Sequence, residues 1–205
     1  MVRRAMSQSG QDGQGKRLRL GALASGGGTN LQAIIDACKR GDLNAEVCVV
    51  ISNNSGARAL ERARSEGIPT YHLSTVTHPD SLDDEICRTL ESYDVEWVLL
   101  AGYMRLMGAA TLNRYRNRVL NSHPALLPKF GGKGMYGSHV HKAVLDAGES
   151  VTGVTIHYVD EQYDHGETFT QCEVPVLPDD TLESLEERVK ERERRFWVET
   201  ISSLS

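Results

Sequence analysis

Short apolar runs and amphipathic stretches alternate along the first half of the chain. The runs at 18–24, 46–51 and 95–101 are nearly continuous in apolar residues, which is typical of strands covered on both faces of a parallel sheet. Residues 30–39 place apolar side chains at the i, i+3, i+4 and i+7 spacing of one helix face. The pattern therefore predicts buried strands separated by amphipathic helices.

The segments that follow continue this alternation. We expect a helix over 56–66 that ends at Gly67, a short strand over 70–73 and a helix over 79–92. The order through residue 101 is then βαβαβαβ. It favours an α/β fold of the Rossmann-like kind, an open, mostly parallel twisted sheet with helices on both faces and right-handed crossovers.

The last third of the chain has a different pattern. Two longer runs at 151–159 and 168–176 predict an antiparallel pair of strands near the C-terminal end. A charged helix follows from Thr181, a residue type that favours the N-cap position. We expect a single domain over 18–205, preceded by a flexible tail over 1–17 that is rich in Gln, Gly and Ser.

Charge is unevenly distributed along the chain. The 205 residues include 23 Lys or Arg and 28 Asp or Glu, which gives a net charge of −5. Residues 1–19 hold five basic residues and one acidic residue, so residues 20–205 hold 18 basic and 27 acidic residues, a net −9. A body this acidic argues against a dedicated nucleic-acid-binding protein, which needs a basic face to displace counterions from phosphates.

The sequence shows no sign of a membrane span, of a secretory signal or of a metal-binding motif. The apolar runs 47–51 and 97–101 are far shorter than the roughly 20 residues that span a bilayer, and the N-terminus lacks the apolar stretch of a secretory signal. The four cysteines form no Cys-x-x-Cys pair, so we expect reduced thiols in a cytoplasmic protein. His139 and His141 lack a third ligand and are expected on the surface of a helix.

The first candidate site is the SGGGTN segment at 25–30, between a predicted strand and a predicted helix. Glycine permits a positive φ, and a helix N-terminus presents free N–H groups and a positive dipole end, which suits a phosphate. The segment matches neither the dinucleotide-binding fingerprint nor a Walker A loop. The three glycines followed by Thr and Asn favour anion binding. A plain tight turn between strand and helix is the alternative.

The second candidate is LNSHPALLP at 120–128, at the end of a predicted strand. Ligands of open α/β sheets bind beyond the carboxyl ends of the strands. Alternate strand residues project to the same side, so Asn121 and His123 can converge on one substrate atom. An amide offers N–H donors, and a histidine changes its charge near physiological pH. A hydrogen-bonded core histidine is the alternative.

The third candidate is the acidic segment 160–167, which has four acidic residues in eight positions. For Asp160, Glu161 and Glu167 a solvated hairpin loop is the favoured interpretation, and the spacing is not that of an EF-hand calcium loop. One carboxylate folded toward His123 would raise the pKa of that histidine, because the opposite charge favours the imidazolium.

In their order along the chain, these segments resemble the phosphoribosylglycinamide formyltransferases, folate-dependent enzymes of purine biosynthesis. The resemblance runs from about Leu18 to Ser203 and rests on SGGGTNLQAII, GYMRLM, LNSHPALLP, GVTIHYVDEQYDHG and QCEVPV. LNSHPALLP and the later aspartate are shared by the wider formyltransferase superfamily. SGGGTNLQAI is more specific, since this family holds the 5′-phosphate of its substrate there.

The resemblance implies a role for each segment. The catalytic residues would be Asn121, His123 and Asp164. The phosphate, ribose or amine of the substrate would be held by Gly28, Thr29, Asn30, Lys190 and Glu193. The pterin ring of the folate would be lined by Met104, Arg105, Leu106, Met107, Val159, Asp160 and Glu161.

The implied reaction transfers a formyl group from 10-formyltetrahydrofolate, as co-substrate, to the glycine amine of glycinamide ribonucleotide, with no metal. Asn121 and a protonated His123 would stabilise the oxyanion of the tetrahedral intermediate, and His123 would protonate the leaving folate nitrogen. Asp164 would raise the pKa of His123 and position a water molecule. The partners would be these two small molecules, with no nucleic acid and no membrane, and the protein would be a monomer or a homodimer.

Three alternatives remain open at this point. Methionyl-tRNA formyltransferase carries a second, RNA-binding domain, and formyltetrahydrofolate hydrolase carries an extra N-terminal domain. With fewer than 20 residues before the first predicted strand and an acidic body, neither is expected here. A non-catalytic nucleotide-phosphate binding module would keep the glycine-rich turn without needing Asn121, His123 and Asp164 together.

Overall fold

A computed structural model of the protein describes residues 16–204, so nearly all of the tail predicted over 1–17 lies outside the described residues. The strands are β1 (Leu18–Leu23), β2 (Ala45–Ser52), β3 (Thr70–His72), β4 (Trp97–Leu100), β5 (Val119–His123), β6 (Val151–Tyr158) and β7 (Thr168–Pro175). The helices are α1 (Thr29–Arg40), α2 (Arg58–Ser65), α3 (Leu82–Ser92), α4 (Ala109–Arg114), α5 (Ser138–Asp146) and α6 (Leu182–Ser202).

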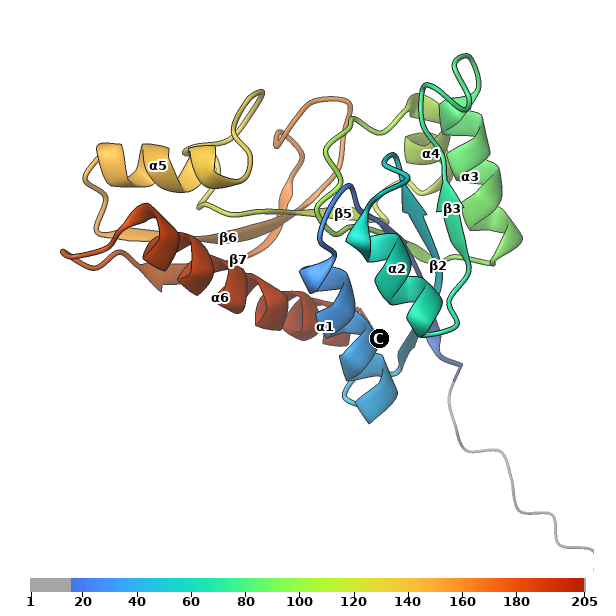
Figure 1. Cartoon of the computed structure of the whole chain (residues 1–205), viewed down its shortest axis with the longest axis horizontal. Coiled ribbons are helices and arrows are strands. Elements are labelled where there is room, and N and C mark those ends of the chain that lie inside the picture. Colours follow the sequence, from blue (N-terminus) through green and yellow to red (C-terminus); the bar gives the residue numbers. More distant parts are fainter. Residues whose placement is uncertain (1–15, 205) are drawn as a thin grey trace, which may run out of the picture.

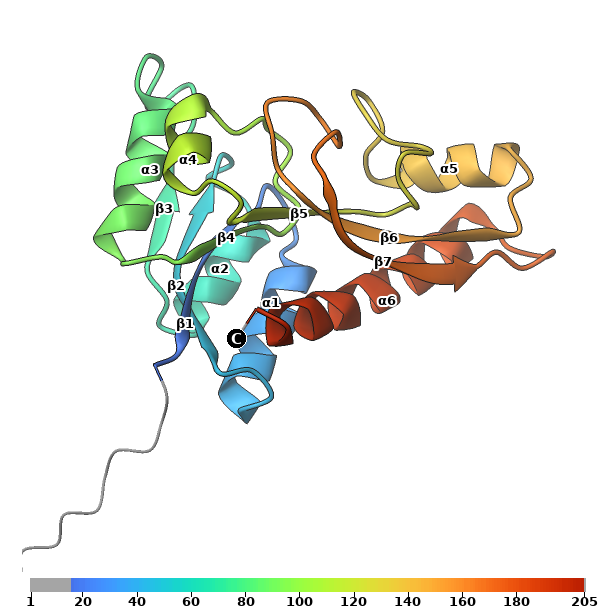
Figure 2. The same cartoon turned by 180° about the vertical axis from the view of Figure 1, so that it is seen from behind.

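The strands form one seven-stranded sheet in the order β3-β2-β1-β4-β5-β6-β7 (Figures 1 and 2). The pairs from β3 to β5 are parallel, whereas β6 pairs antiparallel with both β5 and β7. This confirms the predicted fold, a mostly parallel α/β sheet with an antiparallel pair contributed by the last third of the chain. The change of direction occurs at β5, the strand that ends in the candidate residues Asn121 and His123.

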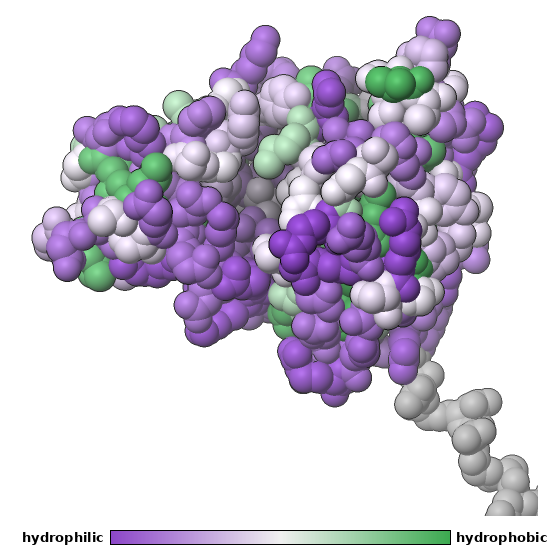
Figure 3. Space-filling view, in the orientation of Figure 1, coloured by the Kyte–Doolittle hydropathy of each residue, from purple (hydrophilic) through white to green (hydrophobic). Residues whose placement is uncertain are grey.

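Helices cover both faces of the sheet. One hydrophobic core joins the sheet to α1, α2, α5 and α6, and a second joins the opposite face to α3 and the segment around α4. Figure 3 views the side on which α1, α2 and α6 lie and shows a mostly hydrophilic surface on which hydrophobic residues form small separate areas. Within residues 16–204, every helix is too short or too polar to cross a membrane.

Most predicted boundaries agree with the structure to within three residues. Gly67, with a φ of +72°, follows the C-cap residue Glu66 of α2, and Thr181 caps α6 in a capping box with Ser184. The prediction for His141 was wrong, because this side chain is 1% exposed. Helix α5 packs against α6 and turns His141 into the interior, while His139 remains exposed.

Candidate active site

The two candidate residues of β5 lie beside the antiparallel strand β6. In the register of this pair, Asn121 is opposite His157 and His123 is opposite Thr155. The side-chain amide nitrogen of Asn121 lies 3.0 Å from Nε2 of His157. A residue of β6, His157, therefore supplies a hydrogen-bond partner for the Asn121 side chain at the end of β5.

Asp164 reaches these histidines from the segment that connects β6 to β7. Its Oδ2 lies 3.3 Å from Nδ1 of His123 and its Oδ1 lies 3.6 Å from Nε2 of His157. The backbone N–H of Gly132 donates a 3.0 Å hydrogen bond to Oδ2. The carboxylate is 10% exposed, so the structure brings Asn121, His123 and Asp164 into one largely buried network.

The segment that carries Asp164 is folded tightly against the sheet. Asp164 itself has a φ of +55°, in the left-handed region. A Cβ atom at Gly166 would lie only 1.9 Å from the carbonyl oxygen of Tyr158, so only glycine fits there. This close approach returns the chain over β6 and directs the carboxylate of Asp164 toward His123.

His123 uses both ring nitrogens within the protein. Nε2 lies 2.7 Å from the carbonyl oxygen of Phe130, which can only accept, so Nε2 carries a proton. Nδ1 faces the carboxylate of Asp164. Protonation of Nδ1 would give an imidazolium that donates from both nitrogens, to Phe130 and to Asp164.

Two opposing effects act on the pKa of His123, and the net result is a pKa below its usual value. Burial of the imidazole lowers its pKa and outweighs the carboxylate of Asp164, which acts in the opposite direction. The rise expected from Asp164 is therefore present, but burial, which the sequence did not reveal, outweighs it. Burial also disfavours the ionised form of Asp164, but the neighbouring side chains of His157 and His123 and the Gly132 N–H together bring the pKa of the carboxyl below its usual value.

His157 is a site residue that the sequence pattern did not single out. Its Nδ1 lies 2.8 Å from the carbonyl oxygen of Tyr158, so Nδ1 donates and Nε2 is free to accept from the amide of Asn121. These two bonds fix both the tautomer of the ring and the orientation of the amide. Its position within the alternating pattern of a strand gave no sign of this role.

The glycine-rich turn leads directly into α1, as predicted. Gly28 is the N-cap residue with a φ of +70°, and a Cβ atom there would lie 2.7 Å from Cα of Ala59 in α2. The turn is also held by α2, since Ala59 N–H donates to Gly26 O at 3.0 Å and Arg62 Nε donates to Gly27 O at 2.8 Å. The first N–H groups of α1 are thus presented from a fixed turn.

The terminal helix α6 connects this turn to β5. Glu193 is 8% exposed, and its carboxylate accepts hydrogen bonds from the side chains of Ser122 and Asn30. Burial raises the pKa of Glu193 despite these donors. Lys190, one helical turn earlier, forms an ion pair with Glu186. Glu193 therefore lies between the turn and β5, whereas Lys190 is paired along its own helix.

The expected pterin-lining segment follows β4. Met104 and Leu106 are 51% and 47% exposed and Arg105 is exposed, while Met107 is buried in the second core together with Tyr103. Val159 packs against the same core, so the two segments expected to form the slot lie on one face of the sheet.

A cavity of about 370 Å³ lies next to one of these segments. It is lined by Val159, Asp160, Glu161 and Gln162 together with residues of α4 and the segment after it. Met104–Met107 are not among its lining residues, so this cavity is lined by only one of the two segments expected to hold the pterin ring.

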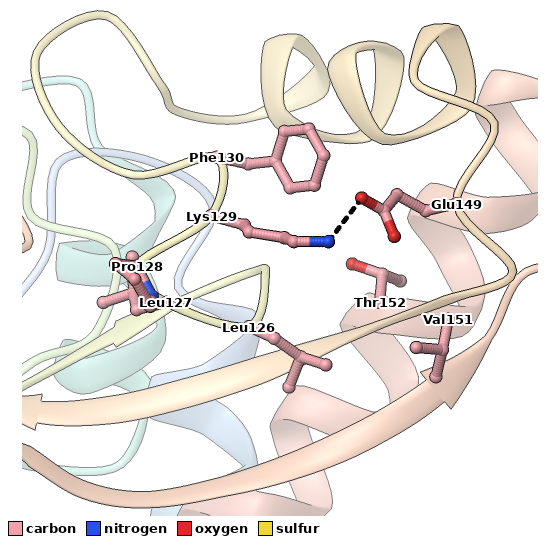
Figure 4. A pocket seen from close by; sticks show the side chains of 8 residues that line it. All are labelled: Leu126, Leu127, Pro128, Lys129, Phe130, Glu149, Val151 and Thr152. Atoms are coloured by element: carbon pink, nitrogen blue, oxygen red, sulfur yellow. Dashed lines mark hydrogen bonds and ion pairs between the residues drawn. The ribbon is translucent and has the colours of Figure 1, made fainter.

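A separate pocket of about 270 Å³ has Phe130 in its wall (Figure 4). It is lined by residues 126–130 together with Glu149, Val151 and Thr152, and Lys129 and Glu149 form a 2.8 Å ion pair in it. None of the residues predicted to act in catalysis or to bind a substrate lines it. Among residues 16–204, no three His, Cys, Asp or Glu side chains are grouped in a way that could hold a metal ion.

Comparison with known proteins gives a consistent result. Residues 18–201 match the profile of the family described as "Formyl transferase". The chain is 39% identical over 198 residues to a chloroplastic phosphoribosylglycinamide formyltransferase of Arabidopsis thaliana, covering 95% of this chain and 68% of that protein. It is 38% identical over 182 residues to phosphoribosylglycinamide formyltransferase of Escherichia coli, covering 88% of this chain and 84% of that protein.

Solved structures agree with the sequence relatives. The crystal structure of glycinamide ribonucleotide transformylase 1 from Symbiobacterium toebii superimposes with a TM-score of 0.85 at 40% identity, over 95% of this chain and 92% of that one. Some relatives are much longer, since the chain spans 18% of the trifunctional purine biosynthetic protein of Gallus gallus and 61% of the formyltransferase of Vigna unguiculata.

Proposed function

The chain belongs to the formyl transferase family and, within it, to the phosphoribosylglycinamide formyltransferases, and we propose that it formylates glycinamide ribonucleotide with 10-formyltetrahydrofolate. The products are formylglycinamide ribonucleotide and tetrahydrofolate, in purine biosynthesis. The observation that supports this most directly is the link between Asp164, His123 and the His157–Asn121 pair beside the turn that leads into α1. That a monomer or homodimer acts in the cytoplasm remains a prediction.

The amine of the nucleotide attacks the formyl carbon, and negative charge develops on the formyl oxygen. The side-chain amide of Asn121 and an N–H of His123 are donors that can stabilise this charge. Because His157 accepts from Asn121 at 3.0 Å, the amide is already oriented when the substrates bind. The donors therefore need little reorganisation as the charge forms.

The proton balance requires one group that moves a proton between nitrogens. The attacking amine loses a proton as the C–N bond forms, and the folate nitrogen gains one as its bond to the formyl carbon breaks. His123 as imidazolium supplies the proton to the leaving nitrogen, and the proton from the amine restores it through a water beside Asp164. The carboxylate of Asp164 stabilises the imidazolium, which burial alone disfavours.

The two substrates would bind beyond the carboxyl ends of different strands, the nucleotide after β1 and the folate after β4. The backbone N–H groups of Gly28–Asn30 suit the 5′-phosphate, because they lie at the N-terminus of α1. Glu193, bonded to Asn30 and Ser122, is placed to accept from the ribose or the amine, and Lys190 can turn from Glu186 toward the phosphate. The folate would lie against Met104–Met107 and Val159–Glu161, which meet at one core.

The test is consumption of 10-formyltetrahydrofolate by the purified full chain, with and without glycinamide ribonucleotide. We expect tetrahydrofolate and formylglycinamide ribonucleotide to form in equal amounts, and only when both substrates are present. Release of formate without the nucleotide would indicate a hydrolase instead. Binding of the nucleotide with no turnover of the folate would indicate a binding module.

A further inference from the structure

The hydroxyl group of Ser25 lies between the two segments assigned to different substrates. Ser25 begins the SGGGTN turn, and its Oγ lies 2.8 Å from the backbone nitrogen of Met104. Met104 is the first residue of Met104–Met107, which is proposed to bind the folate and is called the folate segment. The same Oγ lies 2.5 Å from Oδ1 of Asn53, which follows β2. One side chain thus touches the chain at the ends of three neighbouring strands, β1, β2 and β4.

The direction of these hydrogen bonds is fixed by their partners. A backbone nitrogen can only donate, so Oγ of Ser25 accepts from Met104. The single hydroxyl proton of Ser25 is then available for Oδ1 of Asn53, which accepts. Asn53 therefore sets the rotation of the hydroxyl and directs an oxygen lone pair at Met104.

A second contact joins the same two segments through the backbone. The N–H of Ser25 donates a 2.9 Å hydrogen bond to the carbonyl of Gly102, two residues before Met104. Beyond that point the folate segment has few contacts with the protein, since Met104, Arg105 and Leu106 are all exposed. Ser25 is therefore the first residue of the glycine-rich turn, and its two hydrogen bonds also hold the start of the folate segment in place.

We propose that Ser25 is a positioning residue that couples the two substrate sites, so that binding of the nucleotide strengthens binding of the folate. The inference rests on the proposed function. A phosphate held by Gly28–Asn30 would restrain the turn further than α2 does alone, and with it the backbone of Ser25, whose hydroxyl Asn53 orients toward Met104. Met104–Met107 then lose less conformational freedom when the pterin binds, which is a source of positive coupling without a large structural change. By linkage, the folate strengthens nucleotide binding by the same factor.

The experiment measures binding rather than turnover. Tetrahydrofolate is titrated calorimetrically into the full chain with and without saturating glycinamide ribonucleotide. For the wild-type protein we expect the nucleotide to lower the Kd of tetrahydrofolate by about tenfold, within the usual range of coupling between sites. In Ser25→Ala this factor should fall below about twofold, while the Kd of the nucleotide alone changes less.

Two further variants separate coupling from a general effect on folding. Asn53→Ala keeps Ser25 but removes the acceptor that orients its hydroxyl, so it should also reduce the coupling factor. Ser52→Ala is the matched control, because Ser52 is a buried serine of the neighbouring strand whose hydroxyl accepts from Asn54 N–H and, within residues 16–204, bonds neither Ser25 nor Met104, so it should retain full coupling.

The possible outcomes distinguish this inference from the proposed function. A Ser25→Ala protein with the wild-type coupling factor, or a wild-type protein without coupling, would overturn the role of Ser25 even if formyl transfer is observed. Loss of coupling in Ser52→Ala to the same extent would also overturn it. Absence of formyl transfer by the wild-type protein would instead contradict the proposed function.

Discussion

Nε2 of His123 donates a 2.7 Å hydrogen bond to the backbone carbonyl of Phe130, so the ring nitrogen that does not face Asp164 is occupied by the protein itself. Phe130 has a φ of +55°, an uncommon conformation for a bulky residue. For His123 to protonate a folate nitrogen from Nε2, this carbonyl has to move away. The substrate then takes over a hydrogen bond that already exists, so the histidine need not change its orientation.

Replacing Asp164 by Asn should reduce turnover on the order of 10²-fold while substrate binding changes little. Asp164 is the group that favours the imidazolium of His123, so its loss lowers the pKa of that histidine further. Activity that depends on the protonated form is present below the pKa and is lost as the pH rises through it. The alkaline decline in kcat should therefore move to lower pH in the variant, as steady-state kinetics across pH 5–9 would measure.

The matched experiment for this pair is a double-mutant cycle with His123→Ala. We expect His123→Ala to cost at least as much as Asp164→Asn, and the double variant to lose far less than the product of the two single losses, because the groups act as a unit. Multiplicative losses, or near-normal turnover in Asp164→Asn, would show that Asp164 is only a loop residue.

Replacing Gly28 by Val should weaken nucleotide binding much more than folate binding. The new Cβ atom would lie 2.7 Å from Cα of Ala59, and the positive φ disfavours a β-branched residue. The N–H groups of the turn would be displaced by this contact. Separate titrations with the two ligands would measure the difference, and an equal loss for both would contradict the assignment of the turn.

The neighbouring Gly27 provides the control for that experiment. A Cβ atom at Gly27 has no neighbour within 4 Å, and its φ lies outside the left-handed region. Gly27→Ala should therefore retain nucleotide binding within about twofold, as expected of a surface substitution. A similar loss in both variants would mean that the turn tolerates no side chain for reasons other than the contact with Ala59.

Replacing His157 by Phe should lower kcat by about tenfold, which corresponds to the loss of one oriented hydrogen bond of about 1.4 kcal/mol. Phe has no acceptor for the amide of Asn121, so that amide can rotate away from the developing oxyanion. His157→Gln can supply an acceptor and should recover part of the activity. If both variants keep wild-type kcat, Asn121 does not depend on His157 for its orientation.

Replacing Asp180 by Asn should destabilise the protein without affecting catalysis. Asp180 accepts from both terminal nitrogens of Arg188 and from Leu177 N–H, and the pair with Arg188 lowers its pKa. The loss should be about 2 kcal/mol, or roughly 4–8 °C in Tm for a chain of this size.

The pH dependence of this effect follows from the sign of the shift. A depressed carboxyl pKa contributes stability above the unfolded pKa of about 3.9, and that contribution is lost as the pH falls through the folded value. The difference in Tm between wild type and Asp180→Asn should be largest near pH 7 and shrink toward pH 2. A difference that does not depend on pH would show that the charge of Asp180 is unimportant.

The sequence pattern predicted the elements and the pair Asn121 and His123 because both have local signals, whereas Asp164 was singled out among its acidic neighbours only by the family resemblance. Buried strands are apolar runs, and Asn121 and His123 stand two residues apart at the end of one of them. His157 could not be found in this way, since its role comes from the register between β5 and β6. The net pKa of His123 depends on burial, which no local pattern reports. His141 was misplaced because its partner helix α6 lies 40 residues later in the chain.

Because β6 pairs antiparallel with β5, the connections before and after β6 should differ in how well they tolerate insertions and deletions. Beyond Gly132, whose N–H binds Asp164, the connection to Val151 can gain or lose residues, because pairing with β5 aligns β6 whatever the length of the connection. Between His157 and Asp164 only six residues carry the carboxylate back to His123. One inserted residue could shift it by about 3.5 Å, which is more than the 3.3 Å that separates Oδ2 from Nδ1. Natural variation in length should therefore accumulate on the first of these connections and be absent from the second.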